Sequence, residues 1–198
     1  MKNNLTLAIR IFVLVCALMA TQACTNSHAG TDNADAHNHG VGGDFTLTDY
    51  DNQSFSLSQL RGKIVLIFFG YTNCADACPT MLTKLKRVYS HLGDKQNQIQ
   101  AVFISVDPDR DTPAALKDFL NFFSIRAIGL TGKKADIDKV VKQYGASYEM
   151  QQSDSAAGYH VNHSTYLYLI DQNGKLQSQF KHTDSVDAIA DGIRPLLK

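Results

Sequence analysis

Two cysteines four positions apart, Cys74 and Cys78, are the side chains of this sequence best suited to chemistry. A thiolate can act as a nucleophile, a redox partner or a soft metal ligand. If the chain turns helical after Ala75, residues four apart lie on one face, so both sulfurs can converge on one metal ion. A disulfide is equally reachable if the two Cα atoms come within about 7 Å of each other. The spacing therefore permits both a redox pair and a metal site.

The pair lies where a predicted strand passes into a predicted helix. Residues 64–69 form a short apolar run that is typical of a buried strand, and Gly70 ends it. After Pro79, apolar residues recur at helical spacing as far as Gly93. Unpaired backbone N–H groups at the start of a helix favour negative charge and lower the pKa of a nearby thiol.

The remaining chain supplies the other elements of an α/β domain. A β-hairpin is predicted over residues 44–63 and a second one at 164–170 and 175–180, with strands also at 100–106 and 128–131, the latter a strand or a turn. Helices are predicted from Pro113, over 134–144 and over 184–197, and a loop over 151–158. This order predicts a thioredoxin-like mixed sheet flanked by helices, with an N-terminal β-hairpin. Sheets of this kind place their sites at the carboxyl ends of central strands, where the thiols lie.

A third metal ligand is expected among the histidines. Two cysteines cannot complete a structural zinc site, which takes four ligands, so a partner should lie at the same end of the sheet. We favour His163 because it directly precedes the strand predicted at 164–170, whose entry faces the thiol loop in this arrangement. His160 is the second choice. His91 and His182 are expected to be surface residues.

Residues 1–24 resemble an export signal or a membrane anchor. An apolar run over 11–20 follows a charged start, and it is shorter than the roughly 20 residues of a membrane-spanning helix. Cys24 follows a small residue, which predicts a bacterial lipoprotein acylated at Cys24, although Thr21 occupies a position that is usually aliphatic. Ordinary cleavage and an uncleaved helix are the alternatives. We therefore expect a periplasmic protein that is anchored to the membrane through its N-terminus.

Residues 25–43 are predicted to be a flexible linker, which leaves 44–198 as the folded domain. The linker is rich in small and polar residues. Its histidines could scavenge metal weakly or could simply belong to a solvated spacer, and we favour the spacer; they are His28, His37 and His39. The chain has 19 Lys and Arg and 19 Asp and Glu, and this balance gives no indication of a nucleic-acid surface.

Four stretches together match one known pattern. They are Phe-Gly-Tyr-Thr-Asn-Cys-Ala-Asp-Ala-Cys-Pro at 69–79, Ile-Ser-Val-Asp-Pro-Asp-Arg-Asp-Thr-Pro at 104–113, Gly-Leu-Thr-Gly at 129–132 and Asn-His-Ser at 162–164. In order and spacing they closely resemble the Sco/SenC family, over about residues 44–198. The resemblance implies a thioredoxin-like, membrane-tethered protein that binds copper, as Cu(I) or Cu(II), through Cys74, Cys78 and His163.

The same resemblance implies a role for the chain and its partners. The family assists assembly of the copper A centre of cytochrome c oxidase by delivering copper, by reducing the cysteines of that centre, or both. The implied partners are a copper-receiving oxidase subunit and a thiol reductant. Asp76 and Asp107 follow the family pattern, and Asp107 could orient the loop or a partner surface, or only cap a turn. Asn162 replaces an acid that many relatives carry, which removes a negative charge but no ligand.

Two other functions use the same thiols. A thiol–disulfide oxidoreductase that holds no metal needs Cys74 and Cys78 but not His163. A thiol peroxidase is suggested by Cys78-Pro79-Thr80, but Ala75 stands where peroxiredoxins place a Thr or Ser. A purely structural module is less favoured, because exposed thiols are prone to oxidation. We therefore expect a metallochaperone rather than an enzyme, with thiol–disulfide reductase activity as the alternative.

Overall fold

The computed structural model describes residues 41–153 and 158–198. The predicted signal or anchor at 1–24, with Cys24, lies outside the described residues. So do the three linker histidines. Within the described ranges, no helix has both the length and the apolar character needed to cross a membrane.

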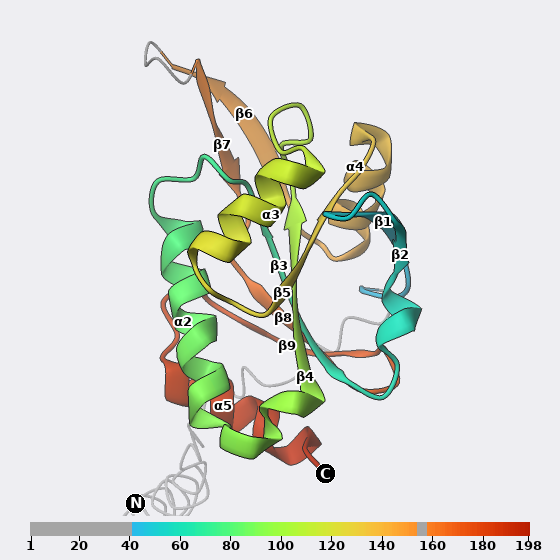
Figure 1. The fold of residues 1–198 in the computed structure, drawn as a ribbon, viewed down its shortest axis with the longest axis vertical. Helices are drawn as coiled ribbons and strands as arrows, with labels where there is room; N and C mark the ends of the chain where they lie inside the picture. The colour runs from blue at the N-terminus through green and yellow to red at the C-terminus, as the bar shows by residue number, and fades with distance from the viewer. Residues whose placement is uncertain (1–40, 154–157) are drawn as a thin grey trace, which may run out of the picture. The chain divides into compact units, whose positions relative to one another are not determined.

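A seven-stranded mixed sheet forms the centre of the domain (Figure 1). Its spatial order is β2-β1-β5-β4-β3-β8-β9. The bounds are β1 Thr46–Asp49, β2 Ser54–Ser56, β3 Ile64–Gly70, β4 Ile99–Ser105, β5 Ala127–Thr131, β8 Leu167–Ile170 and β9 Leu176–Phe180. The strands β3, β4 and β5 run parallel, and the others pair antiparallel. Every residue of β3 and β4 is buried, which explains the apolar run of β3 and the mostly apolar sequence of β4.

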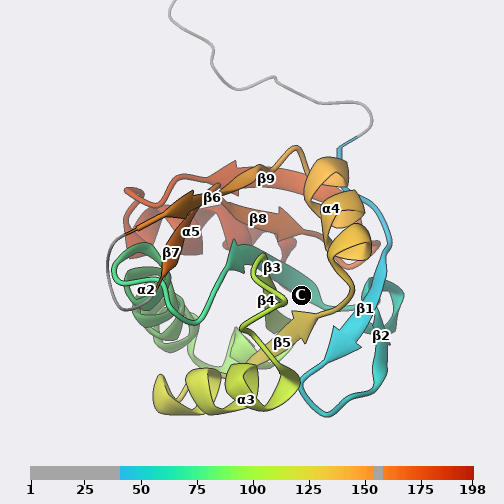
Figure 2. The same cartoon turned by 90° about the horizontal axis from the view of Figure 1, so that it is seen from above.

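Helices cover both faces of this sheet (Figure 2). The helices are α2 Ala77–His91, α3 Pro113–Phe122, α4 Lys134–Gln143 and α5 Val186–Ile193, with short 3-10 helices η1 Leu57–Leu60, η2 Gly93–Gln98 and η3 Arg194–Leu196. Alternate residues of β3 point to opposite faces, as in any strand. Phe68 packs with residues of α2, α3 and α5, whereas Phe69 packs with residues of α4.

A separate two-stranded sheet stands beside the main one. It pairs β6, Tyr148–Gln152, antiparallel with β7, Tyr159–His163. This hairpin was not predicted: the loop expected over 151–158 begins two residues later, after Gln152, and the strand expected to begin at residue 164 does not begin there. The next strand, β8, begins only at Leu167, so His163 ends β7 instead of directly preceding β8. The strand β7 was not predicted because most of its residues are polar, so it lacks the clear apolar alternation that indicates a strand.

The last helix is shorter than predicted. Periodicity favoured a helix over 184–197, but α5 ends at Ile193 and the chain continues as the 3-10 helix η3. Pro195 accounts for the difference, because proline donates no backbone hydrogen bond and its ring clashes with the preceding helical turn.

Candidate metal centre

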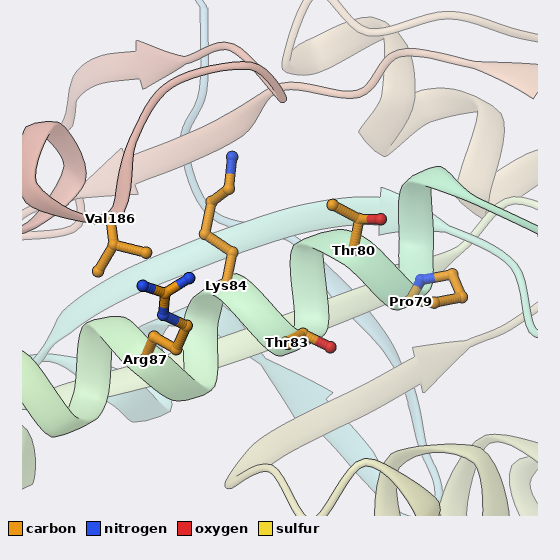
Figure 3. A pocket seen from close by; sticks show the side chains of 6 residues that line it. All are labelled: Pro79, Thr80, Thr83, Lys84, Arg87 and Val186. Carbon is orange, nitrogen blue, oxygen red and sulfur yellow. The ribbon is translucent and has the colours of Figure 1, made fainter.

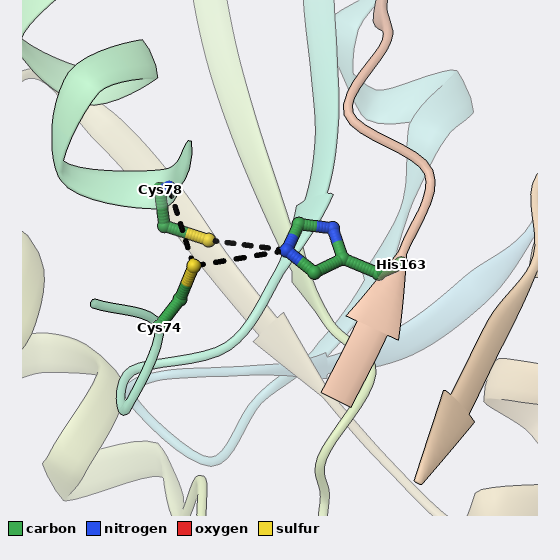
Figure 4. Close-up of side chains that lie close together, drawn as sticks. All are labelled: Cys74, Cys78 and His163. Atoms are coloured by element: carbon green, nitrogen blue, oxygen red, sulfur yellow. Dashed lines mark hydrogen bonds between the residues drawn. The ribbon is translucent and has the colours of Figure 1, made fainter. Parts of the chain in front are cut away.

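Cys74, Cys78 and His163 meet just beyond the carboxyl end of β3 (Figure 4). His163 Nε2 lies 3.8 Å from Cys74 Sγ and 3.7 Å from Cys78 Sγ. All three possible ligand atoms lie within 4.8 Å of one another. In the part of the chain that the structure describes, no other group of three or more His, Cys, Asp or Glu residues is placed to hold a metal ion. The structure thus brings together the three residues that the sequence analysis selected.

The end of β3 and the start of α2 place the two sulfurs. Cys74 lies in the connecting loop and its backbone N–H donates to the Tyr71 carbonyl at 3.2 Å. Cys78 lies in the first turn of α2 and is fully buried, and its backbone N–H points at Cys74 Sγ at 3.5 Å. Gly70 leaves the room for this arrangement, because a Cβ there would lie 2.6 Å from Cys78 Sγ. Both sulfurs are therefore fixed by the central sheet and the helix that follows it.

The two thiols have different acidities. The pKa of Cys74 is lowered, chiefly because the Cys78 thiol hydrogen-bonds to its sulfur, with help from backbone N–H groups. The pKa of Cys78 is raised because its proton is held against Cys74 and because the side chain is buried. In the reduced, metal-free pair, Cys74 therefore loses its proton more readily than Cys78 does. Metal binding would require both thiols to lose their protons.

His163 presents Nε2 to the sulfurs in a fixed orientation. Its Nδ1 lies 3.0 Å from the Ser164 carbonyl oxygen, which can only accept, so we assign the ring proton to Nδ1. Nε2 then keeps its lone pair for a metal ion. The ring also packs edge-on against Phe68 and Tyr71, with centroids 6.0 and 5.7 Å away. A hydrogen bond on the far nitrogen is the usual way in which a protein orients a ligating imidazole.

The other candidate histidines lie elsewhere. His160 is exposed on β7, three residues before His163, and strand alternation turns it to the opposite face. His91 is a surface residue, as expected, and pairs with Asp187 at 3.1 Å. His182 was also expected on the surface, but it is partly buried, and its Nε2 has no hydrogen-bond partner among the described residues. None of these three histidines belongs to the Cys–Cys–His cluster.

Asp107 and Asp111 tie the turn after β4 to both halves of the site. The main-chain carbonyl of Asp107 accepts from the backbone N–H groups of Arg110 and Asp111, which closes the turn without using the Asp107 side chain. The fully buried carboxylate accepts from Arg110 and from the Tyr159 hydroxyl, at 2.5 and 2.7 Å. The Asp107 side chain therefore links the turn to the β6–β7 hairpin.

Asp111 is a residue that the sequence analysis missed. Its buried carboxylate accepts from the Thr72 backbone N–H at 3.0 Å and from the Thr72 hydroxyl at 2.6 Å. It also accepts from the Ser105 hydroxyl at 2.7 Å. Burial raises the pKa of Asp111. This carboxylate clamps the cysteine loop to the end of β4, and only its place in the acidic run 107–111 could have drawn attention to it.

Asp76 and Asn162 lie at the margin of the site. Asp76 is exposed just before α2, and its carboxylate accepts from the Thr80 hydroxyl at 3.4 Å. Asn162 is exposed on the outer face of β7, because it neighbours His163 in a strand. The replacement of an acid at position 162 therefore changes the surface beside the site rather than its lining.

A groove of about 330 Å³ runs along the outer face of α2 (Figure 3). Its lining residues are Pro79, Thr80, Thr83, Lys84, Arg87 and Val186. Lys84 is already engaged there, because its Nζ donates to the carbonyls of His182 and Asp184, each at 2.5 Å. The groove includes none of the three clustered side chains, so it is separate from the candidate metal centre.

A thioredoxin-like sheet with two cysteines after its central strand and a histidine beside them defines a class of thiol and metal-binding proteins. The family model described as SCO1/SenC matches residues 33–198. A SCO2-like protein of Rickettsia conorii is 40% identical over 153 residues, which cover 77% of this chain and 75% of that protein. The chain belongs to the SCO1/SenC family.

Solved structures agree with this assignment. ScoI of Bradyrhizobium japonicum with copper bound is 36% identical, with a TM-score of 0.72, and the match covers 79% of this chain and 99% of that one. Yeast Sco1 with copper bound is 33% identical, with a TM-score of 0.67, and the match covers 78% and 88%. The predicted fold class, a thioredoxin-like mixed sheet flanked by helices, is confirmed.

Proposed function

We propose that this protein binds copper through Cys74, Cys78 and His163 and hands it to another protein. The observation that supports this proposal most directly is the cluster itself: two sulfurs and one imidazole nitrogen lie within 4.8 Å of one another. Two soft thiolates select Cu(I) over hard cations, and an imidazole nitrogen suits Cu(II). Two solved relatives are described as having copper bound.

The donor set suits transfer as well as binding. Three protein ligands leave a coordination position open, so a ligand of a receiving protein can enter before the first ligands leave. Cys74 and His163 are only partly buried, which gives a partner access to two of the three ligands. Because metal binding requires deprotonated thiols, copper competes with protons for Cys74 and Cys78.

The cellular role that we propose is assembly of the copper A centre of cytochrome c oxidase. Membership in the SCO1/SenC family supports it, and the receiving partner is then a copper-binding oxidase subunit. The apolar run at 11–20 and Cys24 support a protein that is tethered to the membrane in the bacterial periplasm, by a lipid or by a retained helix. A thiol reductant is a second proposed partner, because the cysteines must be reduced before they bind copper.

A thiol–disulfide reductase is the second candidate function. The feature that favours it is the unequal thiol pair: the hydrogen bond from Cys78 lowers the pKa of the partly exposed Cys74, and the same contact and burial raise the pKa of Cys78. The Cys74 thiolate could attack a disulfide of a target, which releases one target thiolate and forms a mixed disulfide. Cys78 would then attack Cys74 and release the second target thiol, so the target gains two electrons as the pair becomes a disulfide.

Copper binding by the reduced full-length protein separates the two functions. Cu(II) is added without oxygen, and the visible and electron paramagnetic resonance spectra are recorded for wild type and for His163→Ala. His160→Ala is the matched control, because it removes an imidazole from the opposite face of the same strand. We expect a one-to-one complex with intense thiolate-to-copper absorption that changes in His163→Ala and is kept in His160→Ala.

The cysteines supply the decisive variant. Cys74→Ser with Cys78→Ser should abolish tight copper binding, and unchanged binding in this double variant would remove the proposal. Rapid thiol oxidation without a stable complex, equal in wild type and His163→Ala, would favour the reductase.

A further inference from the structure

The strand β7 contacts the body of the protein at three alternate positions. Tyr159, Val161 and His163 point inward, while His160 and Asn162 between them are exposed. The Tyr159 hydroxyl donates to Asp107 Oδ1 at 2.7 Å, and the Val161 backbone N–H donates to the Tyr71 hydroxyl at 3.2 Å. His163, the last of the three, reaches the two sulfurs. The Tyr159 side chain therefore shares a strand face with the proposed metal ligand, and the Val161 backbone is held at the edge of β7 between them.

Arg110 joins the first contact to the second. Its Nε pairs with the buried Asp107 carboxylate at 2.5 Å, and its Nη1 donates to the Tyr159 carbonyl at 3.0 Å. The guanidinium carbon lies 3.6 Å from the centre of the Tyr159 ring and 5.8 Å from that of Tyr71. Charged hydrogen bonds to a carboxylate that is removed from water are among the stronger ones. The turn after β4 thus holds β7 through three parts of Tyr159: its carbonyl, its hydroxyl and its ring.

This attachment lies at the end of β7 that is far from the metal centre. Tyr159 lies four positions before His163 in the strand, a span of about 13 Å. The opposite end has its own contacts: Ser164 pairs with Ser147, and the Tyr148 hydroxyl donates to Asp138 at 2.5 Å. With both ends held, a β-strand cannot rotate about its axis or slip by one residue without turning His163 away from the sulfurs.

We propose that Arg110 and Tyr159 are positioning residues for His163: together with Asp107 they form an anchor that keeps Nε2 directed at Cys74 and Cys78. This inference rests on the proposed copper function only for the identity of the ligand. Loosening the anchor changes the histidine contribution and leaves both thiolates in place. Because Cu(I) is satisfied by two thiolates and Cu(II) depends more on the imidazole, the anchor acts mainly on Cu(II).

Two variants test the anchor, and the same molecule offers a matched control. Tyr159→Phe removes only the hydroxyl that reaches Asp107, and Arg110→Gln removes the charge. The control is Tyr89→Phe, with Arg126→Gln, at a chemically similar pair distant from the ligands. The Tyr89 hydroxyl donates to the Arg126 carbonyl at 3.1 Å, and the Arg126 guanidinium carbon lies 5.1 Å from the centre of the Tyr89 ring.

Two measurements on the full-length protein distinguish the anchor from the copper proposal. The first is amide hydrogen exchange at Val161 in the reduced, metal-free protein, which needs no copper. We expect exchange to accelerate by at least about tenfold in Tyr159→Phe, more in Arg110→Gln, and not in the controls, as the loss of a hydrogen bond to a charged group predicts. The second is Cu(II) and Cu(I) affinity. We expect Cu(II) affinity to fall by a factor similar to the acceleration of exchange, and the Cu(II) spectrum to change. Cu(I) affinity should stay within about twofold of wild type.

Each outcome decides the question. A loss of Cu(II) affinity that disappears when Tyr159→Phe is made in a His163→Ala background supports the anchor, because the effect then passes through His163. Unchanged exchange, or faster exchange with unchanged Cu(II) affinity, overturns it. Equal losses for Cu(I) and Cu(II), shared with the control variants, also overturn it, since they indicate general destabilisation. If wild type binds no copper, the proposed function fails, and the exchange experiment still judges whether the anchor holds β7.

Discussion

The cysteines and the histidine come from regions that are held in different ways. The strand β3 leads to the cysteines, all of its residues are buried, and it pairs with β4 on one edge and β8 on the other. The strand β7 carries His163 and pairs only with β6, and Val161 is the one buried residue of these two strands. The difference shows that the thiol pair is preorganised by the core, whereas the imidazole depends on a few polar contacts.

The largest expected effect comes from disturbing the cysteine side, by which we mean β3, the loop that follows it and the start of α2. In Gly70→Ala the new Cβ would lie 2.6 Å from Cys78 Sγ and 2.8 Å from the Phe103 ring, so the sulfur must move. We expect a loss of unfolding free energy of about 1–3 kcal/mol, as for other overpacked cores. We also expect copper affinity to fall by at least about 100-fold, measured by competition with a chelator, because ligand geometry must be held closely.

Gly129→Ala is the control for this prediction. Its Cβ would lie 2.9 Å from a Leu120 methyl carbon, which is a similar overpacking in β5 with no ligand nearby. Equal copper affinities in the two variants would show that the cysteine side is less rigid than the burial of β3 indicates.

A smaller effect should distinguish the two regions in the intact protein. Amide protons of β3 should exchange only through global unfolding, while those of β7 should exchange through local opening, at least about tenfold faster. Because a ligand protects the state that it binds, copper should slow exchange in β7 and leave β3 nearly unchanged. Residue-resolved hydrogen exchange with and without copper measures both. Equal protection of β3 and β7 in the metal-free protein would contradict the comparison.

Thiol chemistry should reveal a difference within the cysteine side as well. The pKa of Cys74 is lowered by its hydrogen bond from Cys78, so its thiolate persists below the pH at which an ordinary thiol is protonated. In the reduced, metal-free protein, iodoacetamide should therefore modify Cys74 at pH 6 and spare Cys78, which is buried. Peptide mass spectrometry identifies the modified residue. Modification of both cysteines at similar rates would argue against this difference in acidity.

The smallest expected effect is a pH dependence at Asp111. Burial raises the pKa of this carboxyl above its value in the unfolded chain, so folding takes up a proton in mild acid. The resulting stabilisation is complete below the unfolded pKa of about 3.9 and is lost as the pH rises through the folded pKa. Relative to Asp111→Asn, the metal-free wild type should lose unfolding free energy as the pH rises through that window. Urea unfolding at several pH values measures the difference, and the opposite slope would show that the hydrogen bonds from Thr72 and Ser105 outweigh burial.

The cysteine side was predictable from the sequence because its signals are local. An apolar run, a glycine, a loop and a helix start follow one another within residues 64–82, and each has its own sequence signature. The structure differs from that prediction by only a residue or two at the ends of β3 and α2.

The histidine side, which is the β6–β7 hairpin and the turn after β4, was predicted less well because its structure depends on contacts between distant segments. His163 was selected because it was expected to precede β8 directly, yet it belongs to β7. Most residues of β7 are polar, so the sequence shows no clear alternation of apolar and polar residues there. The partners of Asp111 and Tyr159 are also distant: Thr72 lies 39 residues from Asp111, and Asp107 lies 52 residues from Tyr159. No spacing rule connects such pairs.

The ligands also lie far apart along the chain: 89 residues separate Cys74 from His163, and 85 separate Cys78 from His163. An ion bound by all three would therefore be a cross-link that closes most of the domain into one loop. In the chain-entropy model, a permanent cross-link around a loop of this length opposes unfolding by about 4.5 kcal/mol. Under the proposed function, bound copper would thus stabilise the protein that carries it. Delivery of the copper would return the protein to its less stable form, which unfolds and is cleaved by proteases more easily.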